Sequence, residues 1–184
     1  PCCWDGFELA VRAVLGQQIS VAGATTLARR LVETWGEQHA GEAAQIGLDR
    51  SFPSPERLRD APLETIGLPR TRAATLRALS AAVVNGQLSF EAGQRLDDFV
   101  ERAVALPGIG AWTAQYIAMR ALALPDAFPA GDLVLQQRLG PGAGVARLSE
   151  RATEARSQVW RPWRAYAVLR LWHLPAPLVQ ENAA

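Results

Sequence analysis

Residues 106–114 read Leu106-Pro107-Gly108-Ile109-Gly110-Ala111-Trp112-Thr113-Ala114. The proline ends an incoming helix, two glycines enclose one apolar residue, and a helix-forming sequence follows. The first N–H groups of that helix lack intrahelical partners and favour an anion. The stretch therefore predicts one of two structures: a hairpin whose backbone binds a nucleic-acid phosphate without sequence preference, or an ordinary corner between two helices. A dinucleotide-binding turn is excluded, because Thr113 stands where its third glycine is expected and no strand precedes the turn.

The sequence around this hairpin predicts an all-α protein of roughly ten short helices. Apolar residues recur at helical spacing, turn residues separate the periodic segments, and no segment shows the alternation of a strand. We expect helices at residues 4–15, 20–35, 71–84, 90–105, 111–122, 132–139, 149–159 and 162–173, with a short one beginning at residue 55. Residues 37–50 are polar and are expected to form a loop.

The composition excludes several kinds of chemistry. All 19 basic residues are arginines, so the sequence offers no lysine nucleophile, lysine base or Walker-type phosphate lysine. A formal net charge of +1 neither requires nor excludes a polyanionic partner. Cys2 and Cys3 cannot supply a disulfide framework, a zinc–cysteine site or an iron–sulfur cluster, and His39 and His173 are too far apart for a metal site. No apolar run reaches a membrane span and no signal-peptide pattern is present, which favours the reducing cytoplasm.

Three further segments add to the information in the hairpin. They are Ala13-Val14-Leu15-Gly16-Gln17-Gln18-Ile19-Ser20, Phe128-Pro129-Ala130-Gly131-Asp132 and Trp160-Arg161-Pro162-Trp163-Arg164-Ala165-Tyr166-Ala167. Together with residues 106–114 they resemble the helix–hairpin–helix DNA glycosylase superfamily, and within it bacterial DNA-3-methyladenine glycosylase II. The resemblance implies that residues 1–184 form one catalytic region, with the hairpin at about 104–113 and two subdomains around an active-site cleft. The family usually carries an extra N-terminal α+β domain, to which we find no counterpart in this sequence.

Asp132 is the candidate catalytic residue. Taken alone, an aspartate between a glycine and an apolar run is an N-cap of a helix. The resemblance implies that Asp132 is also the family's catalytic carboxylate, and the two roles are compatible because capping orients the side chain. A carboxylate beside the anomeric carbon stabilises the oxocarbenium character of the sugar when a glycosidic bond breaks. We interpret Asp126 as a loop residue rather than a second catalytic carboxylate.

Three aromatic residues are candidates for a pocket that holds the damaged base. Trp112 and Tyr116 are four residues apart and share a helix face, and the resemblance adds Trp172 to them. Electron-rich rings favour a cationic base by about 0.5–2 kcal/mol per good contact. The alternative for each is core packing, which we expect instead for Trp4, Trp35 and Trp163.

The missing lysine bears on the reaction. In the glycosylases of this superfamily that also nick the strand, a lysine lies two residues after the second glycine of the hairpin, where this chain has Trp112. The resemblance therefore implies a monofunctional enzyme that leaves an abasic site.

Two segments are expected to face DNA. The resemblance places Gln17 and Gln18 in a loop beside the duplex, where the family has an apolar wedge at the position of Gln18. An amide at that position can still fill the gap left by a flipped base, although a plain polar connection between helices is the alternative. Gly108, Gly110 and Thr113 of the hairpin are the other candidate DNA-binding residues.

The resemblance also implies a monovalent cation held by the backbone carbonyls of Val104, Leu106 and Gly108, which would bridge protein and phosphate. No cofactor is expected for catalysis. Several arginines are candidates for phosphate contacts, and the sequence favours none of them individually: Arg120, Arg138, Arg161, Arg164 and Arg170.

These observations favour a monomeric, cytoplasmic bacterial glycosylase that flips alkylated bases such as 3-methyladenine out of duplex DNA and hydrolyses the N-glycosidic bond. Two alternatives remain open at the level of sequence. One is a DNA-binding module that keeps the hairpin without the chemistry. The other is a mismatch or uracil glycosylase of the same fold.

Overall fold

The computed structural model describes residues 2–140 and 147–174. Its helices are α1 (Gly6–Leu15), α2 (Val21–Trp35), α3 (Glu42–Gln45), α4 (Pro55–Arg59), η1 (Leu63–Ile66), α5 (Arg70–Val84), α6 (Leu96–Val104), α7 (Ala111–Ala121), α8 (Leu133–Arg138), α9 (Glu150–Ser157), η2 (Gln158–Trp160) and α10 (Arg164–His173). Apart from an isolated antiparallel bridge between Gln38 and Arg50, these two ranges contain no strand. The expected all-α class is therefore confirmed.

Side-chain caps set several of the helix starts. The carboxylate of Asp5 accepts a hydrogen bond from the backbone N–H of Glu8 at 2.6 Å and so begins α1. Ser20 caps α2 through the N–H of Gly23, and Ser149 caps α9 through the N–H of Ala152. Each cap satisfies one of the N–H groups that a helix start leaves unpaired.

Two expected boundaries are wrong. Residues 90–95 do not belong to α6, because the side-chain amide of Gln94 donates to the carbonyls of Ser89 and Glu91 and holds this segment as a turn. The segment 37–50 is not an uninterrupted loop, because it contains α3 and the bridge from Gln38 to Arg50. Both departures come from local polar contacts that carry no hydrophobic periodicity.

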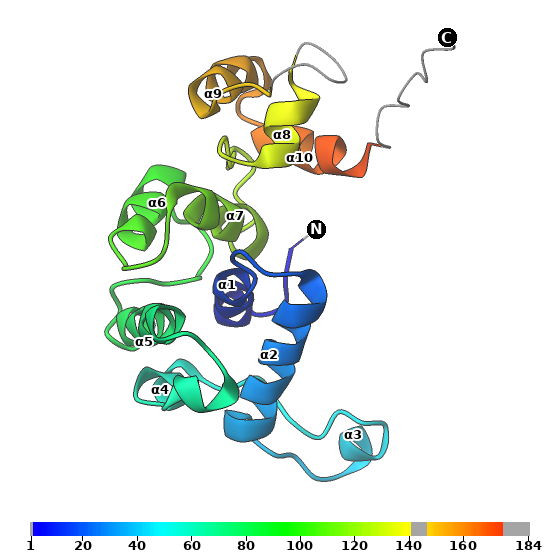
Figure 1. Cartoon of the computed structure of the whole chain (residues 1–184), viewed down its shortest axis with the longest axis vertical. Helices are drawn as coiled ribbons and strands as arrows, with labels where there is room; N and C mark the ends of the chain where they lie inside the picture. The colour runs from blue at the N-terminus through cyan, green and yellow to red at the C-terminus, as the bar shows by residue number, and fades with distance from the viewer. Residues whose placement is uncertain (1, 141–146, 175–184) are drawn as a thin grey trace.

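The helices form two groups (Figure 1). Helices α1 to α7 fill the larger part of the molecule, where α1 packs against α5 and α7, α4 against α5, and α6 against α7. Helices α8, α9 and α10 gather at one end, and residues 122–132 connect them to α7. One hydrophobic core runs from Phe7 in α1 to Val168 in α10, so it links the two groups. No helix within the described ranges has the length and apolarity that crossing a bilayer requires.

The tryptophans expected in the core divide into two kinds. Trp35 packs against the core as expected. Trp4 is fully exposed and Trp163 is 58% exposed, so core packing is wrong for both. Trp4 precedes the N-cap of α1, and Trp163 is itself the N-cap position of α10, where its ring and that of Tyr166 are T-shaped with centroids 5.8 Å apart. A residue outside the periodic part of a helix has no fixed relation to its buried face.

Candidate active site

Asp132 begins helix α8. Its backbone is extended, with φ −70° and ψ 125°, and its Oδ1 accepts a hydrogen bond from the N–H of Leu135 at 3.0 Å. The residue is therefore an N-cap, as its sequence context predicts. The cap fixes the side chain at the junction between the connecting loop and α8.

Two indole groups contact the same carboxylate. Trp112 Nε1 in α7 donates to Asp132 Oδ2 at 3.0 Å, and Trp172 Nε1 in α10 donates to Asp132 Oδ1 at 3.1 Å. Hydrogen bonds to an ionised carboxylate are stronger than those between neutral groups. Each oxygen of Asp132 therefore has a tryptophan N–H partner, and the two donors come from different helix groups.

The aromatic rings form a continuous wall beside this carboxylate. Trp112 and Tyr116 are stacked, with centroids 5.3 Å apart and planes inclined by 7°. Tyr116 lies 6.3 Å from Trp172 at an angle of 42°. The structure thus brings Asp132, Trp112, Tyr116 and Trp172 together, although sequence periodicity relates only Trp112 to Tyr116.

A groove of about 680 Å³ opens beside Asp132. Its lining combines the loop between α1 and α2, the hairpin and the start of α8, and consists of Gly16, Gln17, Gln18, Gly108, Gly110, Trp112, Thr113, Gly131, Asp132, Leu133 and Val134. All five candidate DNA-binding residues of the loop and hairpin therefore border one groove together with the candidate catalytic carboxylate.

The two glycines of the hairpin have different environments. Gly108 has φ +81°, and a Cβ built on it would lie 2.1 Å from Thr75 Oγ1, so both backbone conformation and space require glycine. Gly110 is the N-cap position of α7, and a Cβ there would meet no atom within 4 Å. No side chain caps α7 at this position, so its first N–H groups face the open side of the hairpin.

The three carbonyls expected to hold a cation do not form an open cluster. Leu106 O accepts from the N–H of Ile109 at 3.2 Å, and Gly108 O accepts from Gln17 Nε2 at 3.0 Å. A cation at Gly108 O would face the amide hydrogens of Gln17, which repel positive charge. Val104 ends α6 next to these residues. The cation stays a prediction.

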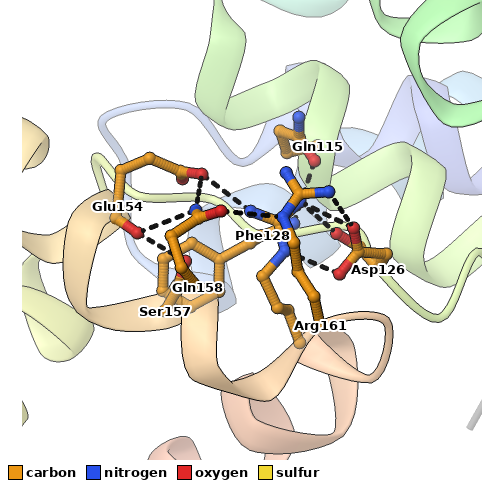
Figure 2. A network of polar contacts seen from close by, with 8 residues as sticks. Gln115, Asp126, Phe128, Glu154, Ser157, Gln158 and Arg161 are labelled. Atoms are coloured by element: carbon orange, nitrogen blue, oxygen red, sulfur yellow. Dashed lines mark hydrogen bonds and ion pairs between the residues drawn. The ribbon is translucent and has the colours of Figure 1, made fainter.

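The loop that carries Asp132 is anchored by a polar network that sequence reasoning missed (Figure 2). Arg164, which is only 3% exposed, donates from Nε to Asp126 Oδ1 at 2.7 Å and from Nη2 to Asp126 Oδ2 at 3.1 Å. A third bond from Arg164 reaches Glu154 Oε1 at 2.7 Å, and Arg161 donates to Asp126 Oδ2 at 2.7 Å. Asp126 therefore lies in the loop, as expected, and also anchors α10, and Arg164 and Arg161 pair with carboxylates.

The same loop is held from two other helices. The backbone N–H of Phe128 donates to Gln115 Oε1 of α7 at 2.9 Å, and Gln136 Nε2 of α8 donates to the carbonyl of Ala130 at 3.3 Å. Asp126 and Arg164 are 38 residues apart, so no local sequence pattern connects them. A short-range signal could not have revealed this network.

A family model described as HhH-GPD superfamily base excision DNA repair protein matches residues 11–164. The chain belongs to this family. The matched residues include the hairpin, the loop before α2, Asp132 and the start of α10. The HhH-GPD family accounts for the all-helical fold with a glycine hairpin between α6 and α7.

Curated relatives of the chain include two proteins from bacteria. The Probable bifunctional transcriptional activator/DNA repair enzyme AlkA of Mycobacterium tuberculosis is 42% identical over 172 residues, which are 91% of this chain and 33% of that protein. DNA-3-methyladenine glycosylase 2 of Escherichia coli is 36% identical over 176 residues, which are 94% of this chain and 59% of that protein. The chain thus spans about three fifths or less of the length of these relatives.

Solved structures show the same HhH-GPD fold. A DNA-3-methyladenine glycosidase from Bacillus halodurans has a TM-score of 0.73 at 25% identity and covers 94% of this chain and 76% of its own. The Schizosaccharomyces pombe 3-methyladenine DNA glycosylase in complex with abasic DNA has a TM-score of 0.70 at 21% identity, with coverage of 92% and 80%. An 8-oxoguanine glycosylase/lyase from Clostridium acetobutylicum reaches 0.75 at 15% identity, with coverage of 91% and 59%. The fold is thus shared by proteins named as glycosylases alone and by a protein named as both a glycosylase and a lyase.

Proposed function

We propose that the chain is a monofunctional DNA glycosylase that excises alkylated bases such as 3-methyladenine from duplex DNA. The observation that carries this proposal is the carboxylate of Asp132, held by two indole N–H groups beside a stacked aromatic wall. The relatives named as 3-methyladenine glycosylases support it. Their longer chains make the activity of this 184-residue chain a matter for experiment.

The proposed reaction begins with extrusion of the target base. The base must leave the stack to reach Asp132, and an alkylated purine carries a positive charge that favours contact with Trp112, Tyr116 and Trp172. The same positive charge makes the base a good leaving group, so no strong general acid is required. The positive charge of the alkylated base therefore both favours its binding and weakens its N-glycosidic bond.

Hydrolysis then follows the pattern of other glycosidic bonds. The bond from C1′ to the base nitrogen breaks, and its electron pair leaves with the base, which becomes neutral. The Asp132 carboxylate stabilises the positive charge on the sugar. A water oxygen forms the new bond to C1′, and Asp132 accepts the proton that the water gives up. The products are the free base and an abasic site.

We infer that the chain does not nick the strand. Cleavage by the lyase route requires an amine that forms a Schiff base with the sugar. The sequence contains no lysine, and Trp112 occupies the hairpin position at which the strand-nicking branches have one. Trp112 instead donates a hydrogen bond to Asp132.

The proposed partner is duplex DNA, bound by a monomer in the cytoplasm. The open N-terminus of α7 at Gly110 supplies backbone N–H groups for a phosphate. Such contacts fix the position of the protein on the duplex without reading its sequence. The arginine-only basic composition supplies charge for this interaction without a nucleophile.

A lesion panel tests the proposal directly. The 184-residue chain is incubated with methylated duplex DNA and with duplexes that contain a U·G or T·G mismatch, and released bases are quantified by chromatography. We expect release of 3-methyladenine, with strand breaks only after alkali treatment. Binding without release of any base would support the non-catalytic module, release only of uracil or thymine would support the mismatch enzyme, and strand breaks without alkali would overturn the monofunctional assignment.

A further inference from the structure

We propose that Gln17 is a positioning residue, which ties the loop before α2 to the DNA-binding hairpin and leaves Gln18 to meet the DNA. The proposal rests on the proposed function, because it concerns how that function holds a duplex. It assigns Gln17 a role other than the direct DNA contact expected from its position in the sequence.

The side-chain amide of Gln17 is engaged within the protein. Gln17 Nε2 donates to Gly108 O at 3.0 Å and to Thr113 Oγ1 at 3.2 Å, across 91 and 96 positions of the chain. An amide nitrogen carries two hydrogens, and these two acceptors account for both. Since a backbone carbonyl can only accept, the contact with Gly108 also fixes which end of the amide faces the hairpin. We call these two hydrogen bonds the Gln17 bridge.

The backbone of Gln17 is held as well. Arg72 Nη2, in the first turn of α5, donates to Gln17 O at 2.5 Å, and the N–H of Gln17 donates to the carbonyl of Val14 at 3.3 Å. Gln17 is thus fixed by α1, by α5 and by the hairpin together. The side-chain amide and the backbone N–H of Gln17 already donate within the free protein. A base or phosphate could bind these groups only by displacing those hydrogen bonds.

The next residue shows the consequence of this anchoring. Gln18 has φ +56°, a conformation that a residue with a Cβ adopts only at a cost of about 1–2 kcal/mol. Such strain persists when neighbouring contacts hold it, and it gathers at functional sites. Gln18 is exposed, and it lines the groove together with Gly108, Gly110 and Asp132. The Gln17 bridge therefore sets the distance between the side chain that meets the duplex and the hairpin that binds its phosphate.

Two substitutions separate positioning from a direct contact. Gln17→Met keeps the length of the side chain and removes both donors without adding charge. Gln17→Glu removes the donors while the carboxyl is ionised and restores one when it takes up a proton. Arg72 is a charged group in contact with this residue, and the wild type run at each pH is the reference for effects of pH on the rest of the groove.

The measurement is kcat/KM for excision of 3-methyladenine from duplex DNA between pH 4 and pH 8, with a melting curve for each variant at each pH. We expect both variants to lose about tenfold in kcat/KM at pH 7.5, and Gln17→Glu alone to recover part of this loss as the pH falls towards 4, where about half of an ordinary glutamate carboxyl is protonated. The recovery compares one protein with itself, so it does not depend on how well the variants fold.

Full activity of Gln17→Met would overturn the proposal, and so would a loss in Gln17→Glu that does not change with pH. A lower kcat/KM for Gln17→Glu together with a normal kcat/KM for Gln17→Met would mean that the added charge only repels DNA. That result would also overturn the proposal. A wild-type chain that releases no base from any duplex would instead contradict the proposed function, so the two failures are distinguishable.

Discussion

The indole nitrogen of Trp172 lies 3.1 Å from Asp132 Oδ1, although the two residues are 40 positions apart in the chain. Trp112 makes the matching contact with Oδ2 at 3.0 Å from another helix. The rings proposed to hold the damaged base therefore also orient the carboxylate proposed to act on its sugar. In the proposed reaction, base binding and chemistry are therefore coupled through the same two tryptophans.

Replacing either indole by a phenyl ring tests this coupling. Trp172→Phe and Trp112→Phe keep an aromatic face and remove one N–H donor to Asp132. A hydrogen bond to a charged group contributes about 1.5–3 kcal/mol, so we expect the single-turnover rate of base release to fall at least about tenfold. Binding of a duplex with an abasic site should change far less. A rate within twofold of the wild type would show that the indole N–H groups do not orient the carboxylate.

The two hairpin glycines give a matched pair of substitutions. Gly108→Ala places a methyl group against the buried Thr75 and forces alanine to φ +81°, so we expect a loss of about 2–4 kcal/mol in the free energy of unfolding. Gly110→Ala meets open space, so its stability should change by less than about 1 kcal/mol. Its methyl group would stand where we propose that a phosphate approaches the N–H groups of α7. Affinity for duplex DNA, measured by fluorescence anisotropy, should fall about tenfold for Gly110→Ala, and an unchanged affinity would place the phosphate elsewhere.

Local sequence signals predicted the elements that depend on local physics. The helical class, the N-cap roles of Ser20, Asp132 and Ser149, and the glycine turn all follow from residues within a few positions of one another. The assembly of Asp132 with Trp112 and Trp172 came from resemblance, because contacts across 20 and 40 positions leave no periodic trace. The roles proposed for these residues stay predictions until the variants are measured.

Long-range polar contacts were beyond prediction for the same reason. Asp126 lies in a loop as expected, and the feature that its sequence could not reveal is the buried Arg164, 38 residues away, which pairs with it. The side-chain amide of Gln17, a candidate for DNA binding, donates to the carbonyl of Gly108, 91 residues away. A polar side chain has the same sequence signature whether it faces water, a ligand or a distant segment of its own chain.

The anchor of the Asp132 loop predicts a large effect of removing Asp126. Asp126→Ala leaves the buried guanidinium of Arg164 with Glu154 as its remaining carboxylate, and breaking a buried pair in this way costs about 3–5 kcal/mol. For a chain of this size the melting temperature should fall by about 10 °C. Arg161→Ala removes a half-exposed partner of the same carboxylate and should cost less than about 1 kcal/mol. Equal decreases in melting temperature for Asp126→Ala and Arg161→Ala, measured by calorimetry, would contradict the role of Asp126 as an anchor.

The stability of the protein at acidic pH should depend on Glu64. Two hydrogen bonds from Arg77, at 2.8 and 3.0 Å, lower the pKa of Glu64 from 4.5 to about 2. A carboxyl with a lower pKa in the folded state stabilises that state above the unfolded pKa, and the contribution disappears as pH falls through the folded pKa. The difference in urea midpoint between wild type and Glu64→Gln should therefore be full above pH 4.5 and vanish near pH 2.

A matched control for this experiment is Glu33→Gln. Glu33 pairs with Arg29 at 2.9 Å, but both side chains are more than half exposed. Exposed pairs contribute little, so at neutral pH this substitution should change the urea midpoint less than Glu64→Gln does. A Glu64→Gln difference that stays constant down to pH 2 would show that Arg77 does not hold the carboxylate.

The central claim is that Asp132 is the catalytic carboxylate of a glycosylase for alkylated bases. Asp132→Asn keeps an oxygen that can accept from Leu135 and Trp172, removes the negative charge, and places an amide where Trp112 donates. The most direct measurement is single-turnover release of 3-methyladenine from methylated duplex DNA by the wild type and by this variant, with binding to the same DNA measured in parallel. The account predicts base release by the wild type and at least a hundredfold slower release by Asp132→Asn, on the order of the effect of removing one charge-stabilising group, with affinity for DNA largely kept. Near-normal release by Asp132→Asn would contradict it.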